Sequence, residues 1–371
     1  MASSICDVLP AAAALLGAAH QTDAFGLSEY AGDVRRVVVV LVDGMGLQLL
    51  PELADGAPLL ASVLAGETGR LDELVCTFPS TTPTSLASLG TGVPPGQHGL
   101  LGFTVNVPGT DRVLNHIFWR DDPPAARWQP VPTWFERLRP AGFDARAVLP
   151  APFIGSGLTE SAYRGAQFCP TSYDDDYADA VIQQVSDATG LVYAYTSALD
   201  TAAHLFGVGS TEWHAAATYV DSLLARVLDA LPPDAALLVT ADHGGVNVAA
   251  DARVDLDADP RLSAGVRVVA GEPRVRYLHT EPGAAPDVIA AWTELLAGRA
   301  EIYSRDNAVA AGFFGPVRPE HLARIGDVVV ICHDIAVLAG RREPPEVAQL
   351  VGMHGGATPV EMAIPLISFR G

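Results

Sequence analysis

Several short runs of apolar residues in the chain continue without alternation and then stop at polar residues and glycines. The first run, Val37 to Val42, is mostly β-branched and ends at Asp43. Leu191 to Thr196 and Leu237 to Thr240 have the same form. Such runs are typical of strands buried on both faces of a parallel sheet. The pattern therefore predicts an α/β protein with a doubly wound, mostly parallel central sheet flanked by helices.

The remaining periodicity predicts further elements around this sheet. Additional strands are expected at residues 71–77, 113–119, 145–149, 266–269, 274–278, 300–304, 327–332 and 364–369, and helices at 84–90, 177–186, 212–231 and 286–296. Single cores usually stop growing at roughly 250 to 300 residues, and this chain has 371. We therefore expect one catalytic domain over residues 1–371, with covering insertions at about 100–188 and 251–325.

Net charge and composition argue against some classes of function. The formal net charge is −20, which argues against a protein that grips a nucleic-acid polymer or an anionic membrane. The four cysteines are scattered, without a CxxC pair, which fits a reducing compartment. The apolar stretch Leu9 to Ala19 predicts a short helix rather than a signal peptide, because Asp7 and no basic residue precedes it. No apolar run approaches the ~20 residues of a membrane span, so a cytoplasmic location is expected.

Acidic and histidine residues follow three of the predicted strands. Asp43 ends the first run, Asp242 and His243 follow Thr240, and Asp200 stands four residues before His204, a spacing that shares one face of a helix. An aspartate at such a position can simply cap the next helix. Helix capping is a good explanation for an aspartate at one such position, but a poor one for aspartates at three of them. In open α/β sheets the carboxyl ends of the strands form the ligand crevice, so these side chains are expected to converge there.

Together with His354, which lies among glycines, these residues form a set of three aspartates and three histidines. A set without cysteine suits zinc or manganese. Six protein ligands are too many for one open catalytic zinc and enough for two ions. Two metals ~3.5 to 4 Å apart can hold the attacking and leaving oxygens of a phosphoryl displacement. We therefore expect two divalent metal ions, zinc in the first place and manganese as the alternative.

A dense cluster of hydroxyl groups stands at the start of the predicted helix at 84–90. Its members are Ser80, Thr81, Thr82, Thr84 and Ser85. Helix capping accounts for one or two of them. A helix N-terminus also attracts anions, so a hydroxyl nucleophile placed here would meet a phosphate in a favourable field.

Two further groups of residues have an open interpretation. Aromatic residues in the first predicted insertion either pack in the core, which is the commoner role, or shape a substrate pocket: Phe103, Phe118, Trp119, Trp128, Trp134 and Phe153. Glu361 is either a hydrogen-bond acceptor behind the metal ligands or a surface residue.

Six motifs in order make the chain resemble the alkaline phosphatase superfamily, and within it the type I phosphodiesterase and nucleotide pyrophosphatase family. They are VDGMG at 42–46, FPSTTPTS at 78–85, TGVPPGQHG at 91–99, DTAAH at 200–204, ADHGG at 241–245 and MHGG at 353–356. The resemblance spans about 310 residues and implies an alkaline phosphatase-like fold.

The resemblance also implies roles for individual residues. One zinc would be bound by Asp200, His204 and His354, and the other by Asp43, Asp242, His243 and Thr82. Thr82 would be the nucleophile and form a phosphothreonine intermediate, which water then hydrolyses. Thr81 and Thr84 remain rival nucleophiles. Ser85 stands where the family often has an asparagine that holds a phosphate oxygen, so Ser85 is a candidate substrate-binding residue.

The expected activity is hydrolysis of a small-molecule phosphodiester or pyrophosphate, with a nucleotide-like substrate. A phosphomonoesterase, a phosphonate hydrolase or a phosphosugar mutase of the same superfamily is the alternative. A sulfatase would need a Cys or Ser in a C/S-x-P-x-R setting, and residues 76–90 contain no arginine. A binding module without catalysis is the alternative from another class, and the complete ligand set argues against it.

Overall fold

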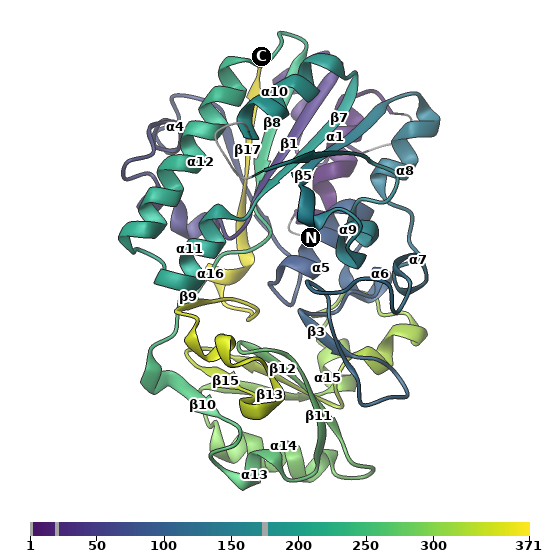
Figure 1. Ribbon diagram of the computed structural model, residues 1–371, viewed down its shortest axis with the longest axis vertical. Coiled ribbons are helices and arrows are strands. Elements are labelled where there is room, and N and C mark those ends of the chain that lie inside the picture. The colour runs from purple at the N-terminus through teal and green to yellow at the C-terminus, as the bar shows by residue number, and fades with distance from the viewer. Residues whose placement is uncertain (1–2, 19–21, 173–176) are drawn as a thin grey trace.

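The computed structural model describes residues 3–18, 22–172 and 177–371, and it has two lobes stacked along the long axis of the molecule (Figure 1). The larger lobe holds a seven-stranded sheet, and the smaller lobe holds a four-stranded sheet. Helix α1 (Val8–Leu15) covers most of the predicted N-terminal helix, whose last residue, Ala19, lies outside the described residues.

The seven-stranded sheet confirms the predicted fold class. Its spatial order is β2 (Arg70–Val75), β17 (Ala363–Arg370), β8 (Ala235–Thr240), β1 (Arg36–Val42), β7 (Gly190–Thr196), β5 (Asp144–Pro150) and β6 (Gln167–Thr171). Strand β1 pairs in parallel with β7 and β8, whereas β17 is antiparallel to both of its neighbours. The sheet is therefore mixed and mostly parallel.

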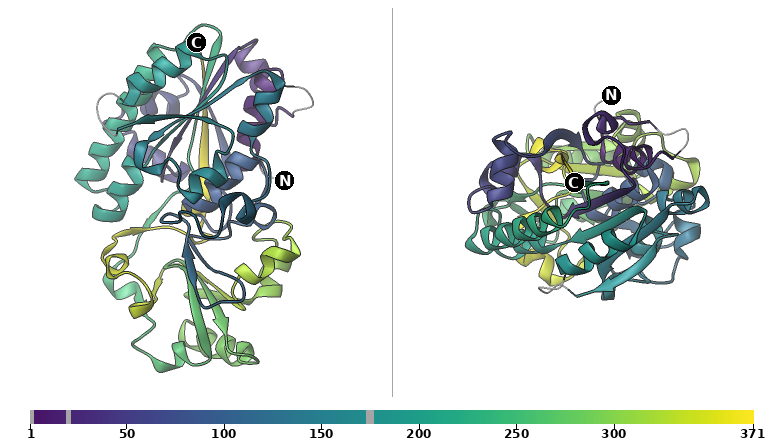
Figure 2. Two further views of the ribbon diagram at one scale, coloured as in Figure 1. Left: turned by 45° about the vertical axis from the view of Figure 1, so that its right-hand side comes forward. Right: turned by 90° about the horizontal axis from the view of Figure 1, so that it is seen from above.

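Helices cover both faces of this sheet, which explains the unbroken apolar runs. Helices α10 (Tyr177–Asp187) and α12 (Thr211–Asp229) lie in front of the sheet in Figure 1, and α1 lies behind it, as the view from above in Figure 2 shows. Every residue from Val37 to Val42 is 0% exposed. A strand with no solvent-facing side has no reason to alternate.

The register brings the candidate residues to one edge of the large sheet. Val42 of β1 lies opposite Thr196 of β7, and Leu41 lies opposite Thr240 of β8. The residues that follow these strands therefore emerge side by side. Strand β17 runs the other way, so the segment that precedes it arrives at the same edge.

The smaller lobe has its own sheet and its own hydrophobic core. The antiparallel order is β11 (Val266–Glu272), β12 (Val275–Thr280), β14 (Val328–Cys332) and β13 (Ala300–Ser304). Helices α13 (Pro260–Ser263) and α14 (Ala285–Leu295) contribute Leu262 and Trp292 to this core. Strand β14 extends the sheet beyond residue 325, where the predicted insertion ends.

The region 100–188 has a double role. It supplies β5 and β6 to the large sheet, and it also forms a hairpin of β3 (Thr104–Asn106) and β4 (Val113–Asn115) that packs against β11. The strand predicted over 113–119 ends at Asn115. The Asn115 side-chain oxygen accepts hydrogen bonds from the backbone N–H groups of Ile117 and Phe118, and this turns the chain.

The other elements are short. They are α2 (Leu27–Ala31), α3 (Leu50–Leu53), α4 (Pro58–Leu64), α5 (Thr82–Thr91), α6 (Pro95–His98), α7 (Ala125–Trp128), α8 (Trp134–Leu138), α9 (Gly157–Ala162), α11 (Ala198–Phe206), α15 (Arg305–Ala310), α16 (Pro359–Met362), β9 (Val246–Asn247), β10 (Arg253–Asp255), β15 (Ala336–Leu338) and β16 (Gly352–Met353). Among the helices of the described residues, none combines the length and the apolar character that crossing a membrane requires.

Candidate metal centre

Three of the predicted ligands form a fully enclosed group at the ends of β1 and β8. We call Asp43, Asp242 and His243 the buried group; their side chains are 0–3% exposed. His243 Nε2 lies 3.4 Å from Asp43 Oδ1 and 3.5 Å from Asp242 Oδ2. Both of these carboxylate oxygens are buried and have no hydrogen-bond partner among the described residues. Buried oxygens without donors, converging on an imidazole nitrogen, fit a divalent cation.

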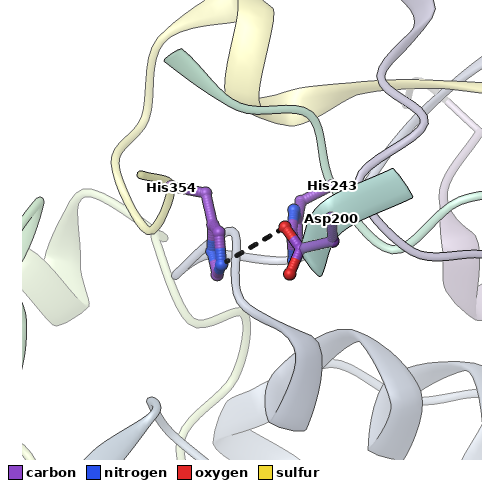
Figure 3. A group of neighbouring side chains, drawn as sticks. All are labelled: Asp200, His243 and His354. Atoms are coloured by element: carbon purple, nitrogen blue, oxygen red, sulfur yellow. Dashed lines mark ion pairs between the residues drawn. The ribbon is translucent and has the colours of Figure 1, made fainter. Parts of the chain in front are cut away.

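The other three predicted ligands form a second group beside the first. We call Asp200, His204 and His354 the open group, because their side chains are 15%, 24% and 8% exposed. His204 Nε2 is 3.2 Å from Asp200 Oδ2 and 3.2 Å from His354 Nε2. His243 stacks on His354 with ring centroids 3.7 Å apart, and Figure 3 shows both rings beside Asp200. His243 therefore joins the two groups.

The three histidines of the two groups are oriented in the same way. The Nδ1–H of His204 donates to the carbonyl of Gly352, that of His243 to its neighbour Gly244, and that of His354 to Ser80. A carbonyl can only accept, so Nδ1 carries a proton in each ring, and Nε2 is the atom that each ring could offer to a metal ion. This arrangement is common behind metal-binding histidines.

Glycines allow the loops after β1, β7 and β8 to approach each other. A Cβ atom on Gly44 would lie 3.0 Å from Asp200 Cβ, and the backbone there has φ +75°. A Cβ atom on Gly46 would lie 2.6 Å from the Cα of Gly244. The glycines that follow Asp43 and His243 are therefore required for the two strand ends to pack together.

Burial and mutual repulsion raise the pKa values of the carboxyls in the buried group. Burial raises the pKa of Asp43 well above its ordinary value, and the charges of Asp242 and Asp200 raise it further. Burial likewise raises the pKa of Asp242, although His243 opposes the shift. The phenol of Tyr195 donates a hydrogen bond to Asp43 Oδ2. Such a cluster stabilises an added positive charge, either as protons or as a metal ion.

The open group holds its positive charge on a histidine. Burial on its own lowers the pKa of His204, but the adjacent Asp200 carboxylate outweighs it and raises this pKa to about 9. For Asp200, burial raises the pKa, and His204 followed by His354 brings it well below its ordinary value. A divalent cation at this place would substitute for the proton of His204, because metal ligands must be deprotonated.

Helix α5 presents its N-terminus to the buried group. Thr82 begins the helix, and its Oγ1 lies 3.3 Å from His243 Nε2. Thr84 Oγ1 instead donates to the carbonyls of Pro79 and Thr81, at 2.6 and 2.9 Å. Thr81 Oγ1 and Ser85 Oγ are buried without a hydrogen-bond partner among the described residues. Only Thr81 and Thr82 of these hydroxyl residues line the adjoining cavity.

A cavity of about 560 Å³ opens next to both groups. Its lining includes Asp43, Asp200, His204 and His354, and most of its other lining residues are apolar. Of the aromatic residues in question, Phe103, Phe118 and Phe153 line this cavity, whereas Trp119, Trp128 and Trp134 are buried in the core. Arg120 is the only basic side chain other than histidine among the described residues of the lining.

Sequence reasoning missed residues that contact the predicted ligands. Tyr195, which bonds Asp43, lies within an apolar run and resembles an ordinary core aromatic. Glu272, at the end of β11 in the smaller lobe, lines the cavity with its Oε2 3.7 Å from His354 Nδ1. Glu361 is 0% exposed and pairs with Arg274, so it is the buried acceptor and not the surface residue. Glu272 and Arg274 belong to a lobe with no motif of its own.

A family model described as type I phosphodiesterase / nucleotide pyrophosphatase matches residues 37–357. This range contains all seven of the residues predicted as metal ligands or nucleophile. No curated protein sequence matches the chain.

Several solved structures are similar to this fold. Murine ectonucleotide pyrophosphatase / phosphodiesterase 5 superposes with a TM-score of 0.72 and 17% identity, covering 89% of this chain and 87% of that chain. An inactive variant of the murine protein in complex with AMP gives 0.72 and 16%, with 90% and 87% covered. The human counterpart gives 0.70 and 16%, with 90% and 87% covered. At these identities the likeness establishes the fold, and it confirms the predicted architecture.

Proposed function

The chain belongs to the type I phosphodiesterase / nucleotide pyrophosphatase family, and from this we propose that it hydrolyses a small-molecule phosphodiester or pyrophosphate through a two-metal site. One observation carries the proposal: Thr82 Oγ1 stands at the start of α5, 3.3 Å from His243 Nε2, and Thr82 lines the same cavity as four of the predicted ligands. A hydroxyl at a helix N-terminus, beside oxygens that lack donors, suits attack on a phosphate ester.

The ligand groups support two divalent cations. The open group, Asp200, His204 and His354, would hold one ion, with His243 also within reach of Asp200 and His354, and the buried group together with Thr82 would hold the other. The mixture of carboxylate and imidazole favours zinc, with manganese as the alternative. When bound, such ions neutralise developing negative charge and lower the pKa of a coordinated hydroxyl or water.

Thr82 would act as the nucleophile. Its Oγ1 gives its proton to solvent and attacks phosphorus, the bond from phosphorus to the leaving ester oxygen breaks, that oxygen takes up a proton from solvent, and the remaining phosphate ester stays on Thr82 as a phosphothreonine. Water then attacks the same phosphorus, which releases the phosphate product and regenerates Thr82. Ser85 remains the candidate for holding a phosphate oxygen, although it is buried one helical turn after Thr82 and does not line the cavity.

The cavity supports an ester group with an apolar, planar surface. Phe103, Phe118 and Phe153 line the cavity, and aromatic side chains of this kind stack on planar groups. The AMP complex of the inactive murine variant is consistent with a nucleotide ester in this position. The net charge of −20 makes a nucleic-acid polymer an unsuitable substrate.

The decisive experiment compares hydrolysis of bis-p-nitrophenyl phosphate with that of p-nitrophenyl phosphate, with metal content measured on the same purified sample. We expect about two zinc ions per chain and a clear preference for the diester. A preference for the monoester would replace the proposal with a phosphomonoesterase. Two metals without hydrolysis of either ester would favour a phosphonate hydrolase or a phosphosugar mutase.

A further inference from the structure

The smaller lobe reaches the candidate metal centre through one buried ion pair. Arg274 follows β11 in the smaller lobe and is 1% exposed, and Glu361 of α16 is 0% exposed. The pairing is bidentate: Arg274 Nε donates to Glu361 Oε1 at 3.0 Å, and Arg274 Nη2 donates to Glu361 Oε2 at 2.8 Å. The same guanidinium also donates to the carbonyls of Ile335 and His333. Arg274 is thereby fixed in one orientation.

Glu361 also accepts hydrogen bonds from the segment that carries His354, so the ion pair restrains that segment. Its Oε1 accepts the backbone N–H of Gly356 at 2.9 Å, and its Oε2 accepts the hydroxyl of Thr358 at 2.6 Å. A Cβ atom on Gly356 would lie 2.7 Å from Glu361 Oε2, so only glycine permits this approach. We call residues 354–358 the His354 loop.

The His354 loop is connected in turn to the start of the nucleophile helix. The hydroxyl of Ser80 donates to the carbonyl of Gly356 at 2.7 Å and accepts the N–H of Gly355 at 3.1 Å. His354 Nδ1 donates to the carbonyl of Ser80 at 2.9 Å. One network of hydrogen bonds therefore runs from Arg274 to a ligand of the open group and to a residue two positions before Thr82.

A second residue of the same hairpin contacts the loop. The Glu272 carboxyl packs on Gly355, where a Cβ atom would lie 2.6 Å from Glu272 Cδ, and its Oε2 is 3.7 Å from His354 Nδ1. The turn Glu272–Arg274 thus holds two successive glycines of the His354 loop. Buried ion pairs contribute little net stability, because desolvation offsets the attraction. A contribution to stability is therefore not enough to explain why Arg274 and Glu361 form a buried ion pair.

We propose that Arg274 and Glu361 are positioning residues that hold the His354 loop in place, so that the smaller lobe sets the metal affinity of the open group. The inference rests on the two-metal site proposed above. It predicts that weakening the pair releases one metal ion and leaves the other bound. A merely structural role would lower the stability of the whole protein and release both ions together or neither.

The test compares Arg274→Lys with Arg276→Lys in the full chain. Arg276 is a matched control: it stands two residues further along, is 3% exposed, and pairs with Glu343 at 2.6 Å without contacting the His354 loop. A lysine at either position keeps the charge but loses the bidentate contact. Zinc content is measured after dialysis against a chelator at a concentration that leaves the unsubstituted protein loaded.

We expect the unsubstituted protein and Arg276→Lys to keep about two zinc ions, and Arg274→Lys to keep about one, with roughly 10- to 100-fold weaker binding at the lost position. Added zinc should restore kcat of Arg274→Lys. Equal zinc loss in the two lysine variants, or none in Arg274→Lys, would overturn the proposal.

Thr358→Val is the milder variant if Arg274→Lys yields little folded protein. It removes one donor to Glu361 and leaves the ion pair in place, so a smaller loss of affinity at one position is expected, and an unchanged affinity counts against the proposal. Unsubstituted protein that binds neither zinc nor manganese would refute the proposed function and this inference together. If that protein binds two zinc ions without hydrolysing either ester, only the function is refuted, and the zinc comparison still decides on Arg274.

Discussion

The two ligand groups are built from different parts of the fold. The buried group stands on the ends of β1 and β8, and the pairing register of these central strands fixes its position. The open group takes two ligands from α11 and one from the His354 loop, and its side chains are up to 24% exposed. The pairing of the central strands therefore positions the buried group directly. The other depends on contacts between segments that lie far apart in the sequence.

The largest expected effect comes from removing Thr82, the proposed nucleophile, which stands beside the buried group. Thr82→Ala should lower kcat on the order of 10⁴-fold or more, because the covalent step has no substitute. Metal content should stay near that of the unsubstituted protein, since both groups retain their aspartates and histidines. Diester hydrolysis and zinc content are measured on the same sample.

Thr81→Ala is the matched control for this prediction. Thr81 also lines the cavity but is the residue before the helix. If Thr81→Ala abolished turnover while Thr82→Ala did not, the nucleophile would be Thr81.

The second prediction separates the two groups directly. His354→Ala removes one ligand of the open group, and a loss of metal affinity on the order of 100-fold or more at that position is expected. About one zinc ion should remain on the buried group. His243→Ala should weaken both positions, because His243 lies in reach of both sets of carboxylates. Zinc titration with a chelating indicator distinguishes the two patterns, and identical zinc loss in the two variants would remove the distinction between the groups.

The third and smallest expected effect is a dependence on pH of the melting temperature of the metal-free protein. His204 has its pKa raised from 6.5 to about 9 in the folded state, so its contribution to stability is complete below pH 6.5 and is lost as pH rises through 9. The raised pKa values of Asp43 and Asp242 act in the same direction, because the folded state retains protons that the unfolded state has released. The melting temperature after chelation should fall between pH 6.5 and 9 by roughly 2 °C or more.

The control variants for the pH effect are two histidine substitutions. His204→Gln should reduce the pH dependence to the part that Asp43 and Asp242 contribute, whereas His214→Gln, on α12, should leave it unchanged. A melting temperature that rises with pH in the metal-free protein would contradict the prediction.

The sequence was sufficient for elements whose environment is uniform along their length. The run from Val37 to Val42 is enclosed on both faces, so its composition alone indicates a central strand. Helix α12 has one apolar face, and its predicted bounds 212–231 differ little from Thr211–Asp229. The strand predicted at 113–119 was too long, because a single side-chain oxygen, that of Asn115, ends it. A local hydrogen bond of that kind leaves no periodic signal.

The residues of the site also fall into two kinds: those that the sequence predicts and those that it does not. Asp43, Asp242 and His243 follow apolar runs directly, so a reader of the sequence can place them at one sheet edge. Glu272 and Arg274 could not be found, because their partners are up to 87 residues away and nothing in the local sequence marks them. Tyr195 was hidden for a different reason: its ring packs as part of the core, and only its hydroxyl reaches Asp43.

The position of β17 has a consequence for how the protein is made. This strand is the last in the sequence, yet it inserts between β8, which leads to Asp242, and β2, which leads to Thr82. During synthesis the strand that leads to Thr82 therefore has no partner strand in the large sheet until residues 363–370 have been made. Thr82 and Asp242 come to lie at the same edge only when that late segment inserts between the two strands that lead to them.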